Sequence, residues 1–305
     1  MVRLIRFAVM ALWVVWFAPQ AGAYDEMAVV DGGTIAGKVT ITGGKPIPKG
    51  FNLITFPDPV YCGRISTGTG WRILEEFTVS QGGGLKDVVV MLTEVKQGKP
   101  FAFTPPTIEA RDCRFLPFVT VVRDDHDVKV VNMDPVMHDI QAYETSNLGP
   151  RVLFNVPLPM NPHHPRSGVG AEYHKHIAGE PVVQKVRMTK ERRIFVMQCG
   201  FHAYMESWGL AIEHPYYAIT GPDGSFSLAE VPPGDYAVAA WHPQTGPMLQ
   251  QNITVKAGET ATASFEFKAP TGRRSAHEIV ENPHFGLEAL GRSIDIRPTL
   301  ELQRP

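Results

Sequence analysis

The stretch Arg193-Ile-Phe-Val-Met-Gln-Cys199-Gly-Phe-His202-Ala-Tyr-Met205 joins a strand-like run to a short segment that carries a thiol, an imidazole and a thioether. A regular strand would send Cys199 and His202 to opposite faces, so the two side chains can converge only if residues 199–205 form a loop. Gly200 permits the tight bend that such a loop needs. The stretch therefore predicts a β structure with a candidate metal-binding loop at the end of a strand.

A second histidine stands well upstream, in Asp134-Pro-Val-Met-His138, where the Asp-Pro pair supplies a turn that aims it. Two imidazoles and a thiolate in a plane, with a weak axial thioether, form a mononuclear type 1 copper site. We therefore predict one copper ion with four ligands: His138, Cys199, His202 and Met205. The alternatives are a zinc site and a metal-free core, because such residues at strand ends often serve packing alone.

The first 23 residues have the pattern of an export signal. Arg3 and Arg6 precede an apolar run from 7 to 18, and Ala21-Gly-Ala23 offers a cleavage site. We expect a periplasmic protein without stable membrane insertion; a retained N-terminal anchor is the alternative. Cleavage would leave a net charge of −4, which is too mild to indicate nucleic-acid binding.

The chain has three cysteines, and an oxidising compartment favours pairing two of them. Cys62 and Cys113 lie in ordinary strand or loop contexts, whereas Cys199 has metal-ligand neighbours. We therefore predict a Cys62–Cys113 disulfide, worth about 4 kcal/mol in the chain-entropy view. The alternative is a bridge between Cys199 and one of the others, which would exclude the metal site.

Short strand-like segments separated by Gly, Pro and Asp fill the rest of the chain and predict an all-β protein of antiparallel sandwiches. We place the signal at 1–23 and an elaborated first domain at 24–213, with its copper core at about 85–213. A second domain follows at 214–268. A charged tail occupies 269–305, with a helix expected at about 278–290.

The motif Cys199-x2-His202-x2-Met205 resembles the copper loop of the cupredoxins, with the short spacing of amicyanin. The upstream stretch from Lys129 to His138 resembles their preceding strand and ligand turn. The resemblance implies a Greek-key β-sandwich, one type 1 copper and electron shuttling. It also implies that the imidazole edge of His202 is the exit for electrons. Asp139 departs from the pattern, since many cupredoxins carry asparagine there to brace the loop.

Residues 216–267 resemble a carboxypeptidase-regulatory-like domain, which is a transthyretin-like β-sandwich. The resemblance is carried by Asp223-Gly-Ser-Phe-Ser-Leu228 and by Val231-Pro-Pro-Gly-Asp-Tyr-Ala-Val-Ala-Ala-Trp241. The whole arrangement is similar to exported methylamine-utilisation-like proteins. That similarity implies a redox protein partner, such as a periplasmic cytochrome or dehydrogenase.

A histidine-rich segment lies between the first predicted ligand and the copper loop, with His163, His164, His174 and His176. This segment could hold a second metal ion or capture copper; the alternative is a solvated loop that has no metal-binding role. Motifs for hydrolytic or phosphoryl-transfer catalysis are absent from the sequence. We thus expect an electron carrier and no enzyme. Copper storage or delivery, or a metal-free structural or interaction module, are the competing hypotheses.

Overall fold

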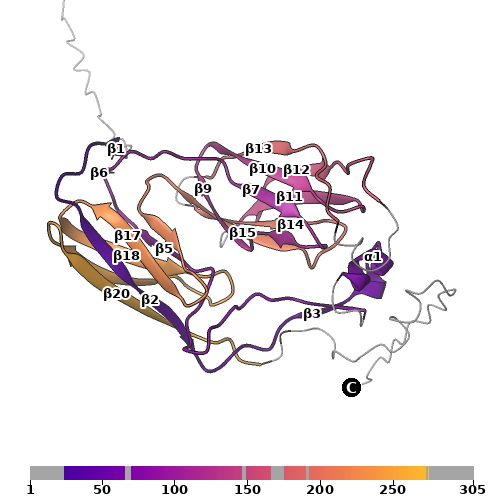
Figure 1. Cartoon of the computed structure of the whole chain (residues 1–305), viewed down its shortest axis with the longest axis horizontal. Coiled ribbons are helices and arrows are strands. Elements are labelled where there is room, and N and C mark those ends of the chain that lie inside the picture. Colours follow the sequence, from indigo (N-terminus) through magenta and orange to yellow (C-terminus); the bar gives the residue numbers. More distant parts are fainter. Residues whose placement is uncertain are drawn as a thin grey trace, which may run out of the picture.

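The computed structural model describes residues 24–65, 70–145, 149–165, 175–189, 192–272 and 274. Nearly all regular structure in these residues is β, which confirms the predicted fold class. The strands form two β-sandwiches that lie side by side (Figure 1). The expected export signal at 1–23, His174, and all of the expected tail after residue 274 lie outside the described residues.

The first sandwich carries the predicted metal loop. One sheet has the order β13 (Val182–Val186), β10 (His126–Asn132), β7 (Thr107–Ala110), β8 (Phe115–Leu116). The other has the order β12 (Arg151–Leu158), β11 (His138–Glu144), β14 (Ile194–Gln198), β15 (Glu206–Ile212), β9 (Val119–Arg123). Alternate residues of β11 are fully buried, as the period of two in a half-buried strand requires.

The second sandwich combines strands from both ends of the chain. One sheet has the order β16 (Tyr217–Ile219), β5 (Val89–Leu92), β18 (Gly234–Trp241), β19 (Leu249–Val255). The other has the order β17 (Ser225–Val231), β2 (Gly33–Thr42), β20 (Thr260–Lys268). The division expected at residue 214 therefore does not separate the sandwiches, because β2 and β5 pair with strands that follow it.

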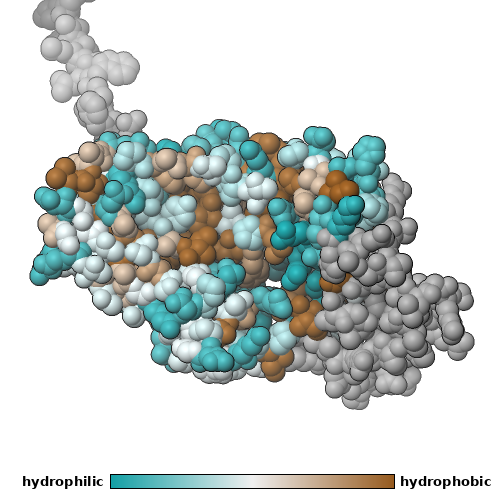
Figure 2. Space-filling view, in the orientation of Figure 1, coloured by the Kyte–Doolittle hydropathy of each residue, from teal (hydrophilic) through white to brown (hydrophobic). Residues whose placement is uncertain are grey.

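The two sandwiches share a packed face. Val88, Val90 and Leu92 of the β5 region point into the core of the second sandwich, whereas Val89 and Met91 pack against β9 and β15 of the first. Burial on both faces explains why this segment is apolar throughout instead of alternating. Hydrophobic surface gathers where the sandwiches meet (Figure 2).

Short elements complete the described structure: β1 (Asp25–Glu26), β6 (Gln97–Gly98), β3 (Gly50–Asn52), β4 (Trp71–Ile73), the 3-10 helix η1 (Leu53–Thr55) and α1 (Pro59–Arg64). We call the segment 50–65 the cap, because it covers one end of the first sandwich (Figure 1). None of the helices in the described part of the chain is long and apolar enough to cross a bilayer.

Candidate metal centre

The turn that delivers His138 to the start of β11 is braced by the end of β10. The Asn132 side chain accepts a hydrogen bond from the Asp134 N–H at 2.9 Å and donates one to the Val136 carbonyl at 3.0 Å. These bonds satisfy backbone groups that the turn would otherwise leave buried and unpaired. His138 itself has no exposed surface, so its ring is held inside the sandwich.

The loop between β14 and β15 delivers the other three candidate ligands. The Cys199 N–H donates to the Met205 carbonyl at 3.2 Å, and the Met205 N–H donates to the His202 carbonyl at 2.7 Å. These bonds close a tight loop directly beyond the pairing of Gln198 with Glu206. Cys199 is 1 % exposed, and His202 and Met205 are not exposed at all. The loop therefore buries all three side chains at the same end of the sheet as His138.

Three ligand atoms from these elements converge. Nδ1 of His138 and Nδ1 of His202 lie 3.2 Å apart, and Sγ of Cys199 lies 3.9 Å and 3.6 Å from them. The point equidistant from the three atoms is about 2.1 Å from each, which matches metal–imidazole and metal–thiolate bonds of about 2.0–2.3 Å. The donor set thus has the size of a site for a single metal ion.

The outer nitrogen of each imidazole fixes which tautomer is present. Nε2 of His138 lies 3.0 Å from Oδ2 of Asp134, and Nε2 of His202 lies 3.1 Å from the Pro57 carbonyl. Both partners are acceptors, so a neutral ring carries its hydrogen on Nε2 and leaves a lone pair on Nδ1. Two lone pairs facing each other at 3.2 Å repel unless a cation lies between them. The residues present therefore fit a metal ion.

Burial shapes the protonation of the ligands. It raises the pKa of the Cys199 thiol to about 11, an effect that backbone hydrogen bonds from the loop only partly offset. Burial also lowers the pKa of His202 to about 4, assisted by the neighbouring His138. Both side chains are thus neutral near pH 7 without a metal. Binding a metal through Sγ requires the loss of the thiol proton.

Asp139 braces the ligand loop although it stands where many cupredoxins carry asparagine. Its Oδ1 accepts a hydrogen bond from the Gly200 N–H at 2.6 Å and lies 3.2 Å from Sγ of Cys199. Its Oδ2 accepts one from Nε2 of Gln141 at 2.8 Å. A side chain at position 200 would come within 2.2 Å of that same Gln141 nitrogen. Glycine at this point leaves that space to the side chains of Gln141 and Asp139.

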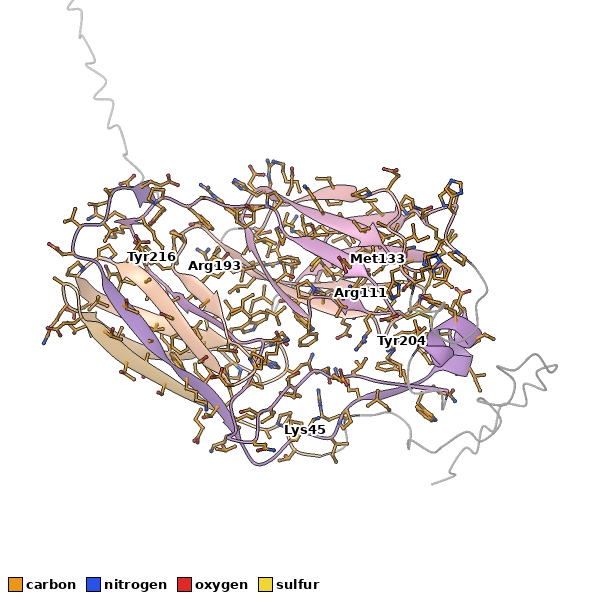
Figure 3. The ribbon with its side chains drawn as sticks, in the orientation of Figure 1. Lys45, Arg111, Met133, Arg193, Tyr204 and Tyr216 are labelled. Atoms are coloured by element: carbon orange, nitrogen blue, oxygen red, sulfur yellow. A yellow bond between two sulfur atoms is a disulfide. The ribbon has the colours of Figure 1, made fainter. Side chains whose placement is uncertain are left out.

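The cap covers His202. The Pro57 carbonyl accepts from Nε2, and Phe56 packs edge-on against Tyr204 with ring centroids 5.1 Å apart. Tyr204 lies beside α1 (Figure 3). Because His202 is fully buried, its imidazole edge does not reach the surface, contrary to the expectation that it is the exit for electrons. The sequence offered no signal for this cover, since residues 50–65 lie far from the ligand motif.

A disulfide ties the cap to the body of the sandwich. Cys62 and Cys113 are bonded, with Cα atoms 5.7 Å apart, and Cys199 is left as a free, buried thiol. A bridge involving Cys199, the alternative to a metal site, is therefore not present. The Cys113 N–H also donates to Oδ2 of Asp134 at 2.9 Å, which connects this bridge to the partner of His138.

In the described residues, His176 of the histidine-rich segment lies close enough to Asp112 and Asp134 for the three side chains to share a metal ion. His164 directs Nδ1 and Nε2 at the carbonyls of Pro165 and Met133, and His176 directs its two nitrogens at the Met133 carbonyl and Asp112. His163 is exposed. A second metal site at this segment stays a prediction, with His176 as the histidine that the structure places beside other donors.

A separate cavity of about 470 Å³ lies between the sandwiches. Ile212, His214 and Arg193 are among the residues that line it, and none of the four predicted ligands does. Arg193 lies where the two sandwiches meet (Figure 3). The cavity is therefore distinct from the metal centre.

Comparisons with known proteins give partial likenesses. Residues 206–263 match a family described as polysaccharide lyase family 4, domain II. The purple cupredoxin of Nitrosopumilus maritimus is 16 % identical over 35 % of this chain and 99 % of its own, with a TM-score of 0.25. The auracyanin of Roseiflexus castenholzii is 11 % identical over 36 % and 98 %, with a TM-score of 0.23.

The copper-containing nitrite reductase of Thermus scotoductus is 17 % identical over 41 % of this chain and 26 % of its own, with a TM-score of 0.24. A search of curated proteins found no match. TM-scores this low do not assign the chain to a family. The resemblance of residues 216–267 to carboxypeptidase-regulatory-like domains stays a prediction, because the family that matches in this region is a different one.

Proposed function

We propose that this chain is a periplasmic electron carrier that binds one mononuclear type 1 copper. In this proposal His138, Cys199 and His202 would be the strong ligands of the ion and Met205 the weak fourth one. The observation that carries it is the convergence of two Nδ1 atoms and Sγ around one point at bonding distance. Copper bound there would alternate between Cu(II) and Cu(I), and this ligand set suits both states.

In this function the polypeptide fixes the positions of the ligand side chains. His138 is fixed by the turn after β10 and by Asp134, and His202 is fixed by the cap. The backbone bonds between Cys199 and Met205 keep the loop closed. Ligands that keep their places in both oxidation states need little rearrangement when an electron moves. The buried surroundings exclude water from the centre.

We further propose that a redox protein, such as a cytochrome or a dehydrogenase, exchanges the electron, and that the chain is not an enzyme. Because the cap covers His202, the partner would approach by another route. Met137 and Phe201 are 52 % and 43 % exposed, and each adjoins a predicted ligand in the sequence. These apolar side chains offer contact for a partner that must bind weakly and leave again.

The test is visible absorption and electron paramagnetic resonance of the purified protein with one equivalent of Cu(II). An intense thiolate-to-copper band with narrow hyperfine splitting would support the proposal, and Cys199→Ala should abolish the band. His176→Ala is a matched control, since it removes a nearby imidazole that is not a ligand. An ordinary weak Cu(II) spectrum would favour copper storage or delivery. No binding would leave a structural or interaction module and refute the proposal.

A further inference from the structure

A carboxylate lies behind the first ligand of the metal centre. Asp134 is fully buried, and it is placed by the turn between β10 and β11. In the sequence, the Asp134-Pro135 pair indicates a turn. The contacts of Asp134 show a larger role, because four hydrogen-bond donors from three separate segments point at its two oxygens.

Each oxygen of Asp134 accepts two hydrogen bonds. Oδ2 accepts from Nε2 of His138 at 3.0 Å and from the Cys113 N–H at 2.9 Å. Oδ1 accepts from the Tyr61 hydroxyl at 3.1 Å and from the Asp112 N–H at 2.8 Å. Acceptance of four donors suits an ionised carboxylate, which has about four lone-pair sites and no hydrogen of its own. Asp134 is thus a buried negative charge in hydrogen-bond contact with a ligand ring.

The carboxylate of Asp134 contacts only one of the two ligand imidazoles, that of His138. The two imidazoles therefore have different hydrogen-bond partners. Nε2 of His138 contacts a carboxylate, whereas Nε2 of His202 contacts the neutral carbonyl of Pro57.

We propose that Asp134 is a positioning residue for the copper centre. It holds His138 in the tautomer that turns Nδ1 toward the metal, and its negative charge favours Cu(II) over Cu(I). The inference rests on the proposed function, since it concerns the same centre. Carboxylates that accept from a metal-bound histidine fix the orientation of the ring and make it a stronger ligand, and their loss costs about 10- to 100-fold in metal affinity or activity.

A purely structural role is the competing explanation, because Asp134 also connects the cap, through Tyr61, with the loop that carries Cys113. The two explanations differ in what they predict for the ring of His138. A structural residue would affect stability without setting the tautomer of His138 or the balance between Cu(II) and Cu(I). A positioning residue sets both.

The first experiment needs no metal and no variant. Long-range ¹H–¹⁵N spectra of the copper-free chain should show His138 with its hydrogen on Nε2 and none on Nδ1. A hydrogen on Nδ1, or an even mixture of tautomers, would overturn the proposal. This result is independent of the copper band, so a failed type 1 site and a failed role for Asp134 can be told apart.

The second experiment compares Asp134→Asn with Asp112→Asn. The control removes a neighbouring charge that contacts His176 and not His138. We expect Asp134→Asn to mix the tautomers of His138 and to weaken Cu(II) binding about 10- to 100-fold. If Cu(I) binding is unchanged, the reduction potential rises by about 59 mV for each tenfold loss.

Equal shifts of the reduction potential in Asp134→Asn and Asp112→Asn would overturn the proposal. An unchanged reduction potential in a folded Asp134→Asn protein would also overturn it. If Asp134→Asn does not fold, the tautomer of His138 in the unaltered chain decides the question alone.

Discussion

The carboxylate of Asp139 provides the sharpest test of the metal centre. Its Oδ1 lies 3.2 Å from Sγ of Cys199 while accepting from the Gly200 N–H. Asp139→Asn keeps an oxygen for that backbone bond and removes the charge. We expect the reduction potential to rise, because a negative charge near the metal stabilises Cu(II) more than Cu(I).

The size of the effect follows from the distances. A metal–thiolate bond of about 2.3 Å added to the 3.2 Å contact places the carboxylate within about 5.5 Å of the metal. At an effective dielectric constant of about 20, unit charges at that separation interact by about 3 kcal/mol. For a one-electron couple this corresponds to about 130 mV. Asp139 is partly exposed, so screening reduces the expected rise to roughly 50–130 mV.

The assay is a spectroelectrochemical titration of the thiolate-to-copper band in both proteins at low salt. Asp223→Asn is the control, because it removes the same charge from an exposed hairpin of the second sandwich. Its potential should match that of the unaltered chain. A fall in potential for Asp139→Asn, or no change while the band persists, would refute the argument that the Asp139 charge stabilises Cu(II) at this centre.

Three further predictions concern the loop, the cap and the thiol. Gly200→Ala should lower the free energy of unfolding, measured in urea, by about 1–2 kcal/mol, because the new methyl would lie 2.2 Å from Nε2 of Gln141 and must push that side chain aside. An unchanged midpoint of urea unfolding would contradict this prediction. Replacing Cys62 and Cys113 by serine should cost about 4 kcal/mol and speed copper release to a chelator; unchanged release would show that the cap does not limit exchange. Because the pKa of Cys199 is about 11, Zn(II) affinity should rise about tenfold per pH unit from pH 7 to 9, and a flat profile would exclude the thiol as a ligand.

Much of the architecture could be predicted from local patterns. Alternating segments such as those of β2 and β11 identify strands, and the glycine and proline turns between them indicate β-sandwiches. The expectation of purely antiparallel sheets was wrong, because β2 pairs with β20, β10 with β7 and β15 with β9 in parallel. The order of the candidate ligands could also be predicted, because a loop is the only way for Cys199 and His202 to share a side. These inferences depend on residues close together in the sequence, where period and spacing carry the information.

The remaining features depend on contacts between distant segments. The pairing of β2 with β20 joins residues such as Thr34 and Thr260, and periodicity alone cannot say which strands become neighbours. The cover over His202 arises in the same way, from Pro57. The Asp-Pro pair indicates a turn at Asp134, but the hydrogen bond between Asp134 and His138 depends on the conformation of that turn, which the sequence does not specify.

The positions of the cysteines along the chain have a consequence for how the protein matures. Cys62 and Cys113, which form the disulfide, both precede Cys199. A chain that emerges from its amino end into an oxidising compartment can therefore join the first two thiols before the third becomes accessible. Consecutive pairing of this kind spares Cys199 from mispairing without a dedicated isomerase. The same early bridge fixes the cap near its final place over His202.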